Sequence, residues 1–228
     1  MAIIELHEVD KVYGGAIDCP VLFNINLSFQ EGSFSSLIGP SGSGKSTLLH
    51  LMGTLDRPTR GEVFVNGRRT EIMSRDQLAE LRNEFIGFVF QFHYLLPEFT
   101  ALENVMMPHW IRGDKNSDAA MRRANELFAL AGILEVRDNL ATRMSGGEQQ
   151  RTAIVRALIN EPRIVLADEP SGNLDTENTK IIYQLFRDIN KRFGTTFVIV
   201  THDRRIAEKT DRIVEIRDGR IVNDSSIA

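Results

Sequence analysis

The stretch GPSGSGKST, residues 39–47, decides how this sequence folds. It holds three glycines, three serines and a threonine around one lysine, Lys45, and has no large apolar side chain with which to build a core. The short β-rich run FSSLIG at 34–39 predicts a strand that leads into it, and KSTLLHLMG predicts a helix that ends near Gly53. The stretch is therefore predicted to be an open loop between a strand and a helix.

The spacing of this loop matches the phosphate-binding pattern G-x-x-x-x-G-K-[ST] at Gly39, Gly44, Lys45 and Ser46. Small residues let successive backbone N–H groups curl around a triphosphate, and the following helix adds its positive N-terminal end. Lys45 would bring a positive charge to the terminal phosphates, and the Ser46 hydroxyl could ligate Mg²⁺. The alternative, a flexible surface turn, does not explain a lysine and a serine at the start of a helix with these glycine spacings.

A pair of acids follows the apolar run at residues 164–167. IVLADE, residues 164–169, places Asp168 directly after four apolar residues, which predicts a strand that ends at a carboxylate. Beside a phosphate-binding loop, Asp168 would hold the metal, and Glu169 could accept a proton from an attacking water. Taken alone, paired acids after a strand are more typical of the start of a helix, so it is the loop that favours catalysis.

MSGGEQQR, residues 144–151, is a third informative stretch. Ser145 and Glu148 have the spacing of a capping box, which predicts that a helix starts here. The cap does not explain Gly146 and Gly147, because glycine costs roughly 0.8–1 kcal/mol relative to alanine inside a helix and less at its ends. A bare helix N-terminus that an anion approaches closely would explain them.

Composition and patterning limit the class of protein. The 228 residues suffice for one α/β domain, and the alternation of helices and strands from Ser145 onward predicts a parallel sheet. Residues 77–141 carry helical patterning and are predicted to form a helical insertion. The net charge of -4 argues against a general affinity for nucleic acid. Cys19 is the single cysteine, and no apolar run approaches the roughly 18 residues of a membrane span, so a membrane role would need a partner.

In their order along the chain, these stretches resemble the ATP-binding cassette family. The resemblance covers nearly the whole chain and rests on GPSGSGKST at 39–47, Gln91, SGGEQQR at 145–151, IVLADEP at 164–170, SGNLD at 171–175 and THD at 201–203. It implies one α/β ATPase domain, 1–228, with the P-loop NTPase fold. A RecA-like core with an antiparallel β subdomain would comprise residues 1–90 and 160–228, and a helical subdomain would span about 91–159. Met144, Glu148 and Ser171 depart mildly from the family pattern and remove no catalytic group.

The same resemblance implies that the cofactors are ATP and Mg²⁺ and that the chain hydrolyses ATP. The implied nucleotide contacts are Tyr13, Gly39, Ser41, Gly42, Ser43, Gly44, Lys45, Ser46 and Thr47, and, facing the nucleotide of a second copy, Ser145, Gly146, Gly147 and Asp175. The implied Mg²⁺ ligands are Ser46, Gln91 and Asp168, and the implied catalytic groups are Lys45, Gln91, Glu169 and His202.

Several of these roles come from the resemblance alone. Tyr13 would stack on adenine, although a lone tyrosine is more often a core or surface residue. Gln91 would reach Mg²⁺ and the attacking water while reporting to a membrane partner. His202 would contact the γ-phosphate through a ring nitrogen. Asp175 would help to organise the facing site, so two copies would sandwich two nucleotides head to tail.

QFHYLLPEFTALENVMMP, residues 91–108, resembles the branch of the family whose ATPases release lipoproteins. The same branch contains macrolide and peptide exporter ATPases and a cell-division regulator, which remain the alternatives. The resemblance implies transmembrane permease subunits as partners and a peripheral place on the cytoplasmic face of the bacterial inner membrane. Core packing is the competing explanation for part of the apolar cluster of Phe92, Leu95, Leu96 and Phe99.

Overall fold

Two β-sheets organise the chain in the computed structural model, which describes residues 1–15, 18–113, 117–172 and 174–227. The larger sheet has the strand order β10-β9-β3-β8-β7-β6, and its neighbouring strands are parallel except for the β10–β9 pair. Its strands are β3 (Phe34–Ile38), β6 (Ile86–Phe90), β7 (Ile164–Asp168), β8 (Thr196–Val200), β9 (Arg212–Arg217) and β10 (Arg220–Ser226). The smaller sheet is antiparallel, in the order β2-β1-β4-β5, and consists of β1 (Ala2–Tyr13), β2 (Cys19–Gln30), β4 (Arg60–Val65) and β5 (Arg68–Arg69).

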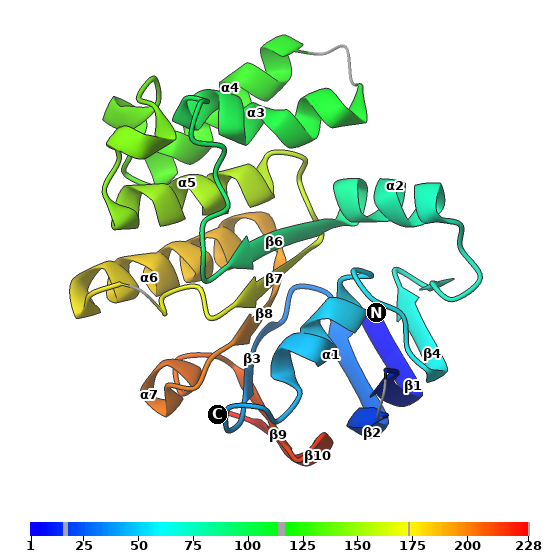
Figure 1. Cartoon of the computed structure of the whole chain (residues 1–228). Coiled ribbons are helices and arrows are strands. Elements are labelled where there is room, and N and C mark those ends of the chain that lie inside the picture. Colours follow the sequence, from blue (N-terminus) through cyan, green and yellow to red (C-terminus); the bar gives the residue numbers. More distant parts are fainter. Residues whose placement is uncertain (16–17, 114–116, 173, 228) are drawn as a thin grey trace.

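Helix α1 (Lys45–Met52) lies between the two sheets (Figure 1). Its buried side chains Leu48 and Leu49 belong to one core cluster with residues of both sheets. The strand and the helix that the sequence predicts around residues 39–44 are confirmed, and the helix ends at Met52 with Gly53 as its C-cap. The loop between them therefore emerges from the packed centre of the molecule.

The other face of the large sheet carries a layer of helices (Figure 1). Along β8, Phe197 and Ile199 pack toward these helices, whereas Val198 and Val200 pack toward α1 and the small sheet. Side chains of a strand alternate between the two faces of its sheet, so a strand covered on both faces is apolar throughout. The remaining helices are α2 (Arg75–Phe85), α3 (Ala101–Arg112), α4 (Ser117–Leu130), α5 (Gly146–Leu158), α6 (Thr176–Phe193) and α7 (Arg204–Ala207), with short 3₁₀ turns η1 (Leu134–Val136) and η2 (Ala141–Arg143).

The expectation that residues 77–141 form a helical insertion is wrong for residues 86–90. These residues form β6, which pairs in parallel with β7 at the edge of the large sheet. IGFVF is a short apolar run, and periodicity alone cannot distinguish such a run from a buried piece of helix. The α/β fold with an antiparallel β part and a helical part is otherwise as the resemblance implied.

Candidate active site

The predicted catalytic side chains lie at the carboxyl ends of neighbouring strands. Residues 39–44 follow β3, His202 comes just after β8, Glu169 follows β7, which ends at Asp168, and Gln91 follows β6. These four strands are consecutive neighbours in the sheet. Ligands of open α/β sheets bind outside the carboxyl ends of the strands. The topology thus gathers residues from four distant parts of the sequence at one edge.

A cleft of about 450 Å³ lies at this edge. Its lining residues are Val21, Ser41, Gly42, Gly44, Lys45, Ser46, Thr47, Gln91, Glu169 and His202. All of them except Val21 belong to the predicted set. Val21 lies on β2, and its carbonyl oxygen would be 3.3 Å from a Cβ on Gly44. Only the packing of the antiparallel sheet over the loop brings it here, and no local sequence signal could have indicated it.

The backbone of the loop presents an open helix end to the cleft. Gly44 is the N-cap of α1 with φ +101°, a left-handed conformation that favours glycine, and it makes no side-chain cap. The first turn of α1 contains no acidic residue. The buried Ser43 hydroxyl has no hydrogen-bond partner in the described part of the chain. Unsatisfied donors at a helix N-terminus bind anions, so these features fit a phosphate group.

Lys45 is buried against the loop at 39–44, to which it would add a positive charge. Its Nζ donates to the carbonyl oxygens of Gly39 and Pro40, at 2.9 and 2.8 Å. The ammonium group is therefore already held above the loop by backbone oxygens. A point charge in this position suits a phosphate ligand.

Ser46, which lines the cleft, contacts Asp168, which is not itself among the lining residues. The Ser46 hydroxyl donates to Oδ1 of Asp168 at 3.2 Å, although the two residues are 122 positions apart. A hydroxyl and a carboxylate are hard oxygen ligands, and Mg²⁺ at nucleotide sites uses one or two such groups together with phosphate oxygens and water. The pair therefore fits a magnesium ion that binds with the nucleotide.

Glu169 and His202 face each other beside this pair. Nδ1 of His202 lies 2.9 and 3.0 Å from the two carboxylate oxygens of Glu169. Glu169 has φ +46°, and its backbone N–H donates to the carbonyl of Val200. A left-handed glutamate stores strain that the surrounding strands must hold in place, and such residues are concentrated at functional sites. With Nδ1 against the carboxylate, Nε2 is the nitrogen with which His202 could contact a phosphate.

The stretch at 144–151 forms the predicted helix start at a different place. Ser145 accepts from the N–H of Glu148, whose carboxylate accepts from the N–H of Ser145 at 2.7 Å, so the capping box is confirmed. The hydrogen bond from the backbone N–H of Ser145 is the main cause of the lowered pKa of Glu148. None of residues 145–147 lines the cleft. Within one chain, the two candidate phosphate sites are therefore separate.

The two glycines of this stretch differ in their surroundings. A Cβ on Gly147 would collide with the amide of Asn178 on α6, whereas a Cβ on Gly146 would meet only Leu174 at 3.8 Å. Packing within the chain thus accounts for Gly147, which sequence reasoning assigned to an approaching anion. Gly146 is exposed, so an approaching anion is still an explanation for this glycine.

Asp175 reaches the same region through Asn178. It caps α6 by accepting from the backbone N–H of Asn178 at 2.7 Å, and this bond is the main cause that lowers the pKa of Asp175. Oδ1 of Asn178 accepts from Arg151 of α5 at 3.2 Å. Asp175 is thereby tied to the helix that begins at Gly146. Asn173, in the middle of SGNLD, lies outside the described residues.

Tyr13 ends β1 and is not among the residues that line the cleft. Its side chain is partly exposed, and Nζ of Lys11 lies 4.7 Å from the centre of its ring. One face of the ring is thus covered by a cation. Adenine stacking by Tyr13 stays a prediction.

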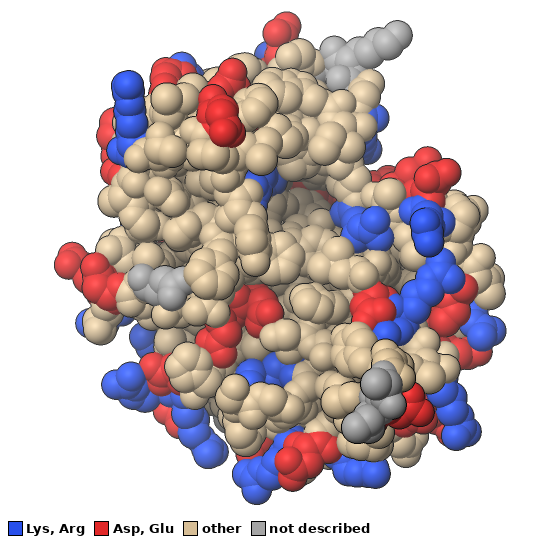
Figure 2. All heavy atoms as spheres, viewed as in Figure 1, with Lys and Arg blue, Asp and Glu red and all other residues tan. Residues whose placement is uncertain are grey.

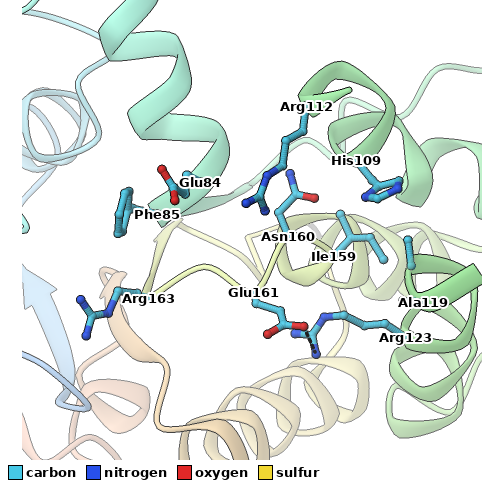
Figure 3. Close-up of a pocket in the computed structure, with 11 residues that line it drawn as sticks. Glu84, Phe85, His109, Arg112, Ala119, Arg123, Ile159, Asn160, Glu161 and Arg163 are labelled. Atoms are coloured by element: carbon cyan, nitrogen blue, oxygen red, sulfur yellow. Dashed lines mark ion pairs between the residues drawn. The ribbon is translucent and has the colours of Figure 1, made fainter. Parts of the chain in front are cut away.

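A second hollow lies away from these residues, between α2, α3, α4 and the segment after α5 (Figure 3). Charged side chains of both signs line it. Arg123 points toward Glu161, 3.6 Å away, and also donates to the carbonyl of Leu158. Arg163 pairs with Glu31. The charges of Arg123, Glu161 and Arg163 are thus matched within the chain, and none of the predicted site residues lines this hollow.

Comparison with known proteins agrees with this geometry. A family model described as ABC transporter matches residues 22–172. The chain belongs to the ABC transporter family. The matched residues include the loop at 39–47, Gln91, the capping box at 145–148 and the Asp168–Glu169 pair, which together make it the ATPase component of such a transporter.

Relatives of this ABC transporter ATPase match over almost the full chain. It is 49% identical to the lipoprotein-releasing system ATP-binding protein LolD 1 of Rhodopseudomonas palustris, with 96% of this chain and 98% of the relative covered. It is 48% identical to LolD of Bacteroides fragilis, covering 96% and 100%. Among solved structures, the dimeric ATP-binding cassette MJ0796 in a post-hydrolysis state with ADP and Pi superposes with a TM-score of 0.91 at 40% identity, with 99% of each chain covered.

Proposed function

We propose that this chain is the ATPase subunit of a lipoprotein-releasing ABC transporter. The observation that carries the proposal is the identity of 48–49% with LolD proteins of two distant bacteria, spread over almost the whole of each chain. The predicted catalytic groups converge on one cleft, which supports an active ATPase. Macrolide or peptide export and cell-division regulation are the alternatives from the same branch.

The cleft would hold ATP with Mg²⁺. The open N-terminus of α1 and Lys45 would bind the terminal phosphates, and Ser46, Asp168 and Gln91 would hold the metal. When bound, Mg²⁺ would neutralise charge on the transferring phosphoryl group. Glu169 is the group positioned to accept the proton of an attacking water, and His202 would both orient Glu169 and contact the γ-phosphate. Adenine would stack on Tyr13.

A second copy would complete each site. Ser145 and Gly146, at the start of α5, are exposed and lie away from the chain's own cleft, which suits contact with a phosphate held by another molecule. The solved structures of MJ0796 are dimeric, which supports pairing of two copies. Asp175 would support this contact through Asn178. In this proposal the helical part at about 91–159 and the rest of the single domain 1–228 act as one ATPase unit.

An exposed aromatic segment supports a membrane partner. Phe92 and Tyr94 are 59% and 65% exposed, and Leu96 is also exposed, whereas Leu95 packs against the core. In Figure 2, uncharged side chains cover the middle of the face on which the segment between β6 and α3 runs in Figure 1. Exposed apolar clusters mark interaction sites. In the described residues no helix is long and apolar enough to cross a bilayer.

We propose that permease subunits bind this segment. Their binding would hold the chain on the cytoplasmic face of the bacterial inner membrane. The test is to trap the Glu169→Gln protein with ATP, purify it from detergent-solubilised membranes of its source and identify its companions by mass spectrometry. Two membrane proteins with large periplasmic domains, recovered together with lipoproteins, are the expected result. A single exporter subunit with a periplasmic adaptor would contradict lipoprotein release and favour efflux.

A further inference from the structure

The segment Phe90–Tyr94, which contains Gln91, is fastened at both ends to a single helix, α5. We propose that Gln150 and Arg156 of α5 are positioning residues that clamp this segment and so set Gln91 in the nucleotide cleft. The proposal rests on the proposed function in taking the cleft as an ATP site. It assigns to α5 a task beyond its N-terminal contact with a phosphate.

Gln150 makes the first fastening. Its side chain is fully buried, and its Nε2 donates to the carbonyl of Phe90 at 3.1 Å and to the carbonyl of Pro170 at 2.7 Å. Phe90 directly precedes Gln91, and Pro170 directly follows Glu169. Because both partners are carbonyl oxygens, the Gln150 side chain must present its NH₂ group to them. If the amide were flipped, its own oxygen would face these two oxygens. One side chain therefore ties the two loops that carry Gln91 and Glu169.

Arg156 makes the second fastening about 9 Å further along α5. Its two terminal nitrogens donate to the carbonyls of Tyr94 at 2.7 Å and His93 at 2.8 Å. Tyr94 has φ +47°, a strained conformation for a residue other than glycine. A partly buried guanidinium with two short bonds can hold that conformation, because charge-assisted hydrogen bonds are the strong ones.

Gln91 lies between the two fastenings. It lines the nucleotide cleft, and a Cβ on Gly172 would lie 2.8 Å from its Nε2, so its side chain packs closely against the loop after Glu169. The exposed ring of Tyr94 also contacts Phe90, with ring centres 5.6 Å apart. A displacement of α5 by a phosphate at Gly146 would therefore move Gln91 and the exposed Tyr94 together.

The test is amide hydrogen exchange of residues 91–99 with and without ATP and Mg²⁺, in the hydrolysis-deficient Glu169→Gln protein. Arg156→Met removes both bonds to the segment. Arg123→Met is the matched control, because Arg123 also donates to a backbone carbonyl, that of Leu158 at the end of α5, and makes no hydrogen bond to the segment. Thermal unfolding and nucleotide titration are run on each variant.

We expect Arg156→Met to speed exchange in 91–99 about tenfold without nucleotide and to abolish the slowing that ATP causes in the parent. Its ATP affinity should stay within about threefold of the parent, since Gln91 is one ligand among several. Arg123→Met should keep the ATP response. Arg156→Lys, which keeps the charge but has a single nitrogen, should restore part of it.

An unchanged ATP response in Arg156→Met would overturn the clamp, as would an equal loss in Arg123→Met, which would indicate general destabilisation. If the parent itself failed to bind ATP, the nucleotide assignment would fall instead. The clamp would then be judged on the nucleotide-free protein, where Arg156→Met must speed exchange in 91–99 more than Arg123→Met does.

Discussion

The backbone conformation of Glu169 suits the catalytic role proposed for this residue. Its left-handed backbone, φ +46°, turns it away from Asp168, which reaches toward Ser46, and directs its carboxylate at His202. Two neighbouring acids thus have separate partners, one a hydroxyl and one an imidazole. This separation is what a site needs if one acid is to hold a metal and the other to receive a proton.

Replacing Glu169 by Gln should keep ATP binding and lower turnover by roughly 10²–10⁴-fold, because the amide cannot accept the proton of the attacking water. Phosphate release at saturating ATP and calorimetric titration with ATP measure the two quantities. Glu161→Gln is the control, since that acid lies in the hollow of Figure 3 and not in the cleft. Turnover of Glu169→Gln near that of the control would remove Glu169 from the role of base.

At the scale of the element, α5 carries three kinds of contact. Its capping box satisfies the first turn, Gly147 admits Asn178 of α6, and Gln150 and Arg156 hold the segment 90–94. The helix therefore joins the start of the second phosphate site to the cleft. Its two glycines should respond differently to the same substitution.

Gly147→Ala should destabilise the fold by about 1–3 kcal/mol, because the new methyl group collides with the Asn178 amide and forces it to move. Gly146→Ala is the matched control and should change stability by less than about 1 kcal/mol, since its methyl group meets only an ordinary contact and alanine favours helix. Urea unfolding of both variants provides the comparison. Equal effects would show that Asn178 does not explain Gly147.

The cap of α5 should make a pH-dependent contribution to the free energy of unfolding. The hydrogen bond from the backbone N–H of Ser145 lowers the pKa of Glu148 below its ordinary value of 4.5, so the folded state binds this proton less readily than the unfolded state does. The cap therefore stabilises fully above about pH 4.5, and the contribution is lost as the pH falls through the lowered pKa. In urea unfolding, the stability advantage of the parent over Glu148→Gln should be present at pH 7 and shrink below pH 4.5. An advantage independent of pH would contradict it.

At the scale of the whole molecule, one chain carries the two parts of a nucleotide site at separate places, so neither part is complete by itself. The cleft is lined by most of the loop at 39–47 and by Glu169, while Ser145 and Gly146 lie elsewhere on the surface. A head-to-tail pair of chains would place each exposed helix start against the nucleotide of the other, which closes with two-fold symmetry. ATP would then act as the connection between copies.

Gly146→Asp should weaken ATP-dependent dimerisation by about 10²-fold or more, because like charges brought together across an interface cost several kcal/mol. Binding of ATP to the monomer should be nearly unchanged, since Gly146 does not line the cleft. Sedimentation velocity with ATP, in the Glu169→Gln background, measures the first quantity, and Gly146→Ala controls for loss of the glycine. Dimerisation at the parent's strength would contradict the shared site.

Residue types and short spacings were enough to predict the local parts of this protein. The open loop at 39–47 and the capping box at Ser145 depend on groups within a few positions of one another, so their pattern specifies them. The family resemblance then implied which distant residues belong together. It could not say how they are held, because a motif carries no information about the packing around it.

Only the tertiary structure decided the contacts between distant elements. It placed residues 86–90 in the large sheet, set Val21 over the loop, filled the space at Gly147 with Asn178 and joined Gln150 and Arg156 to the segment 90–94. These contacts join residues tens of positions apart. They depend on the angles and separations at which strands and helices pack, which follow from the energy of the whole core and not from any short stretch.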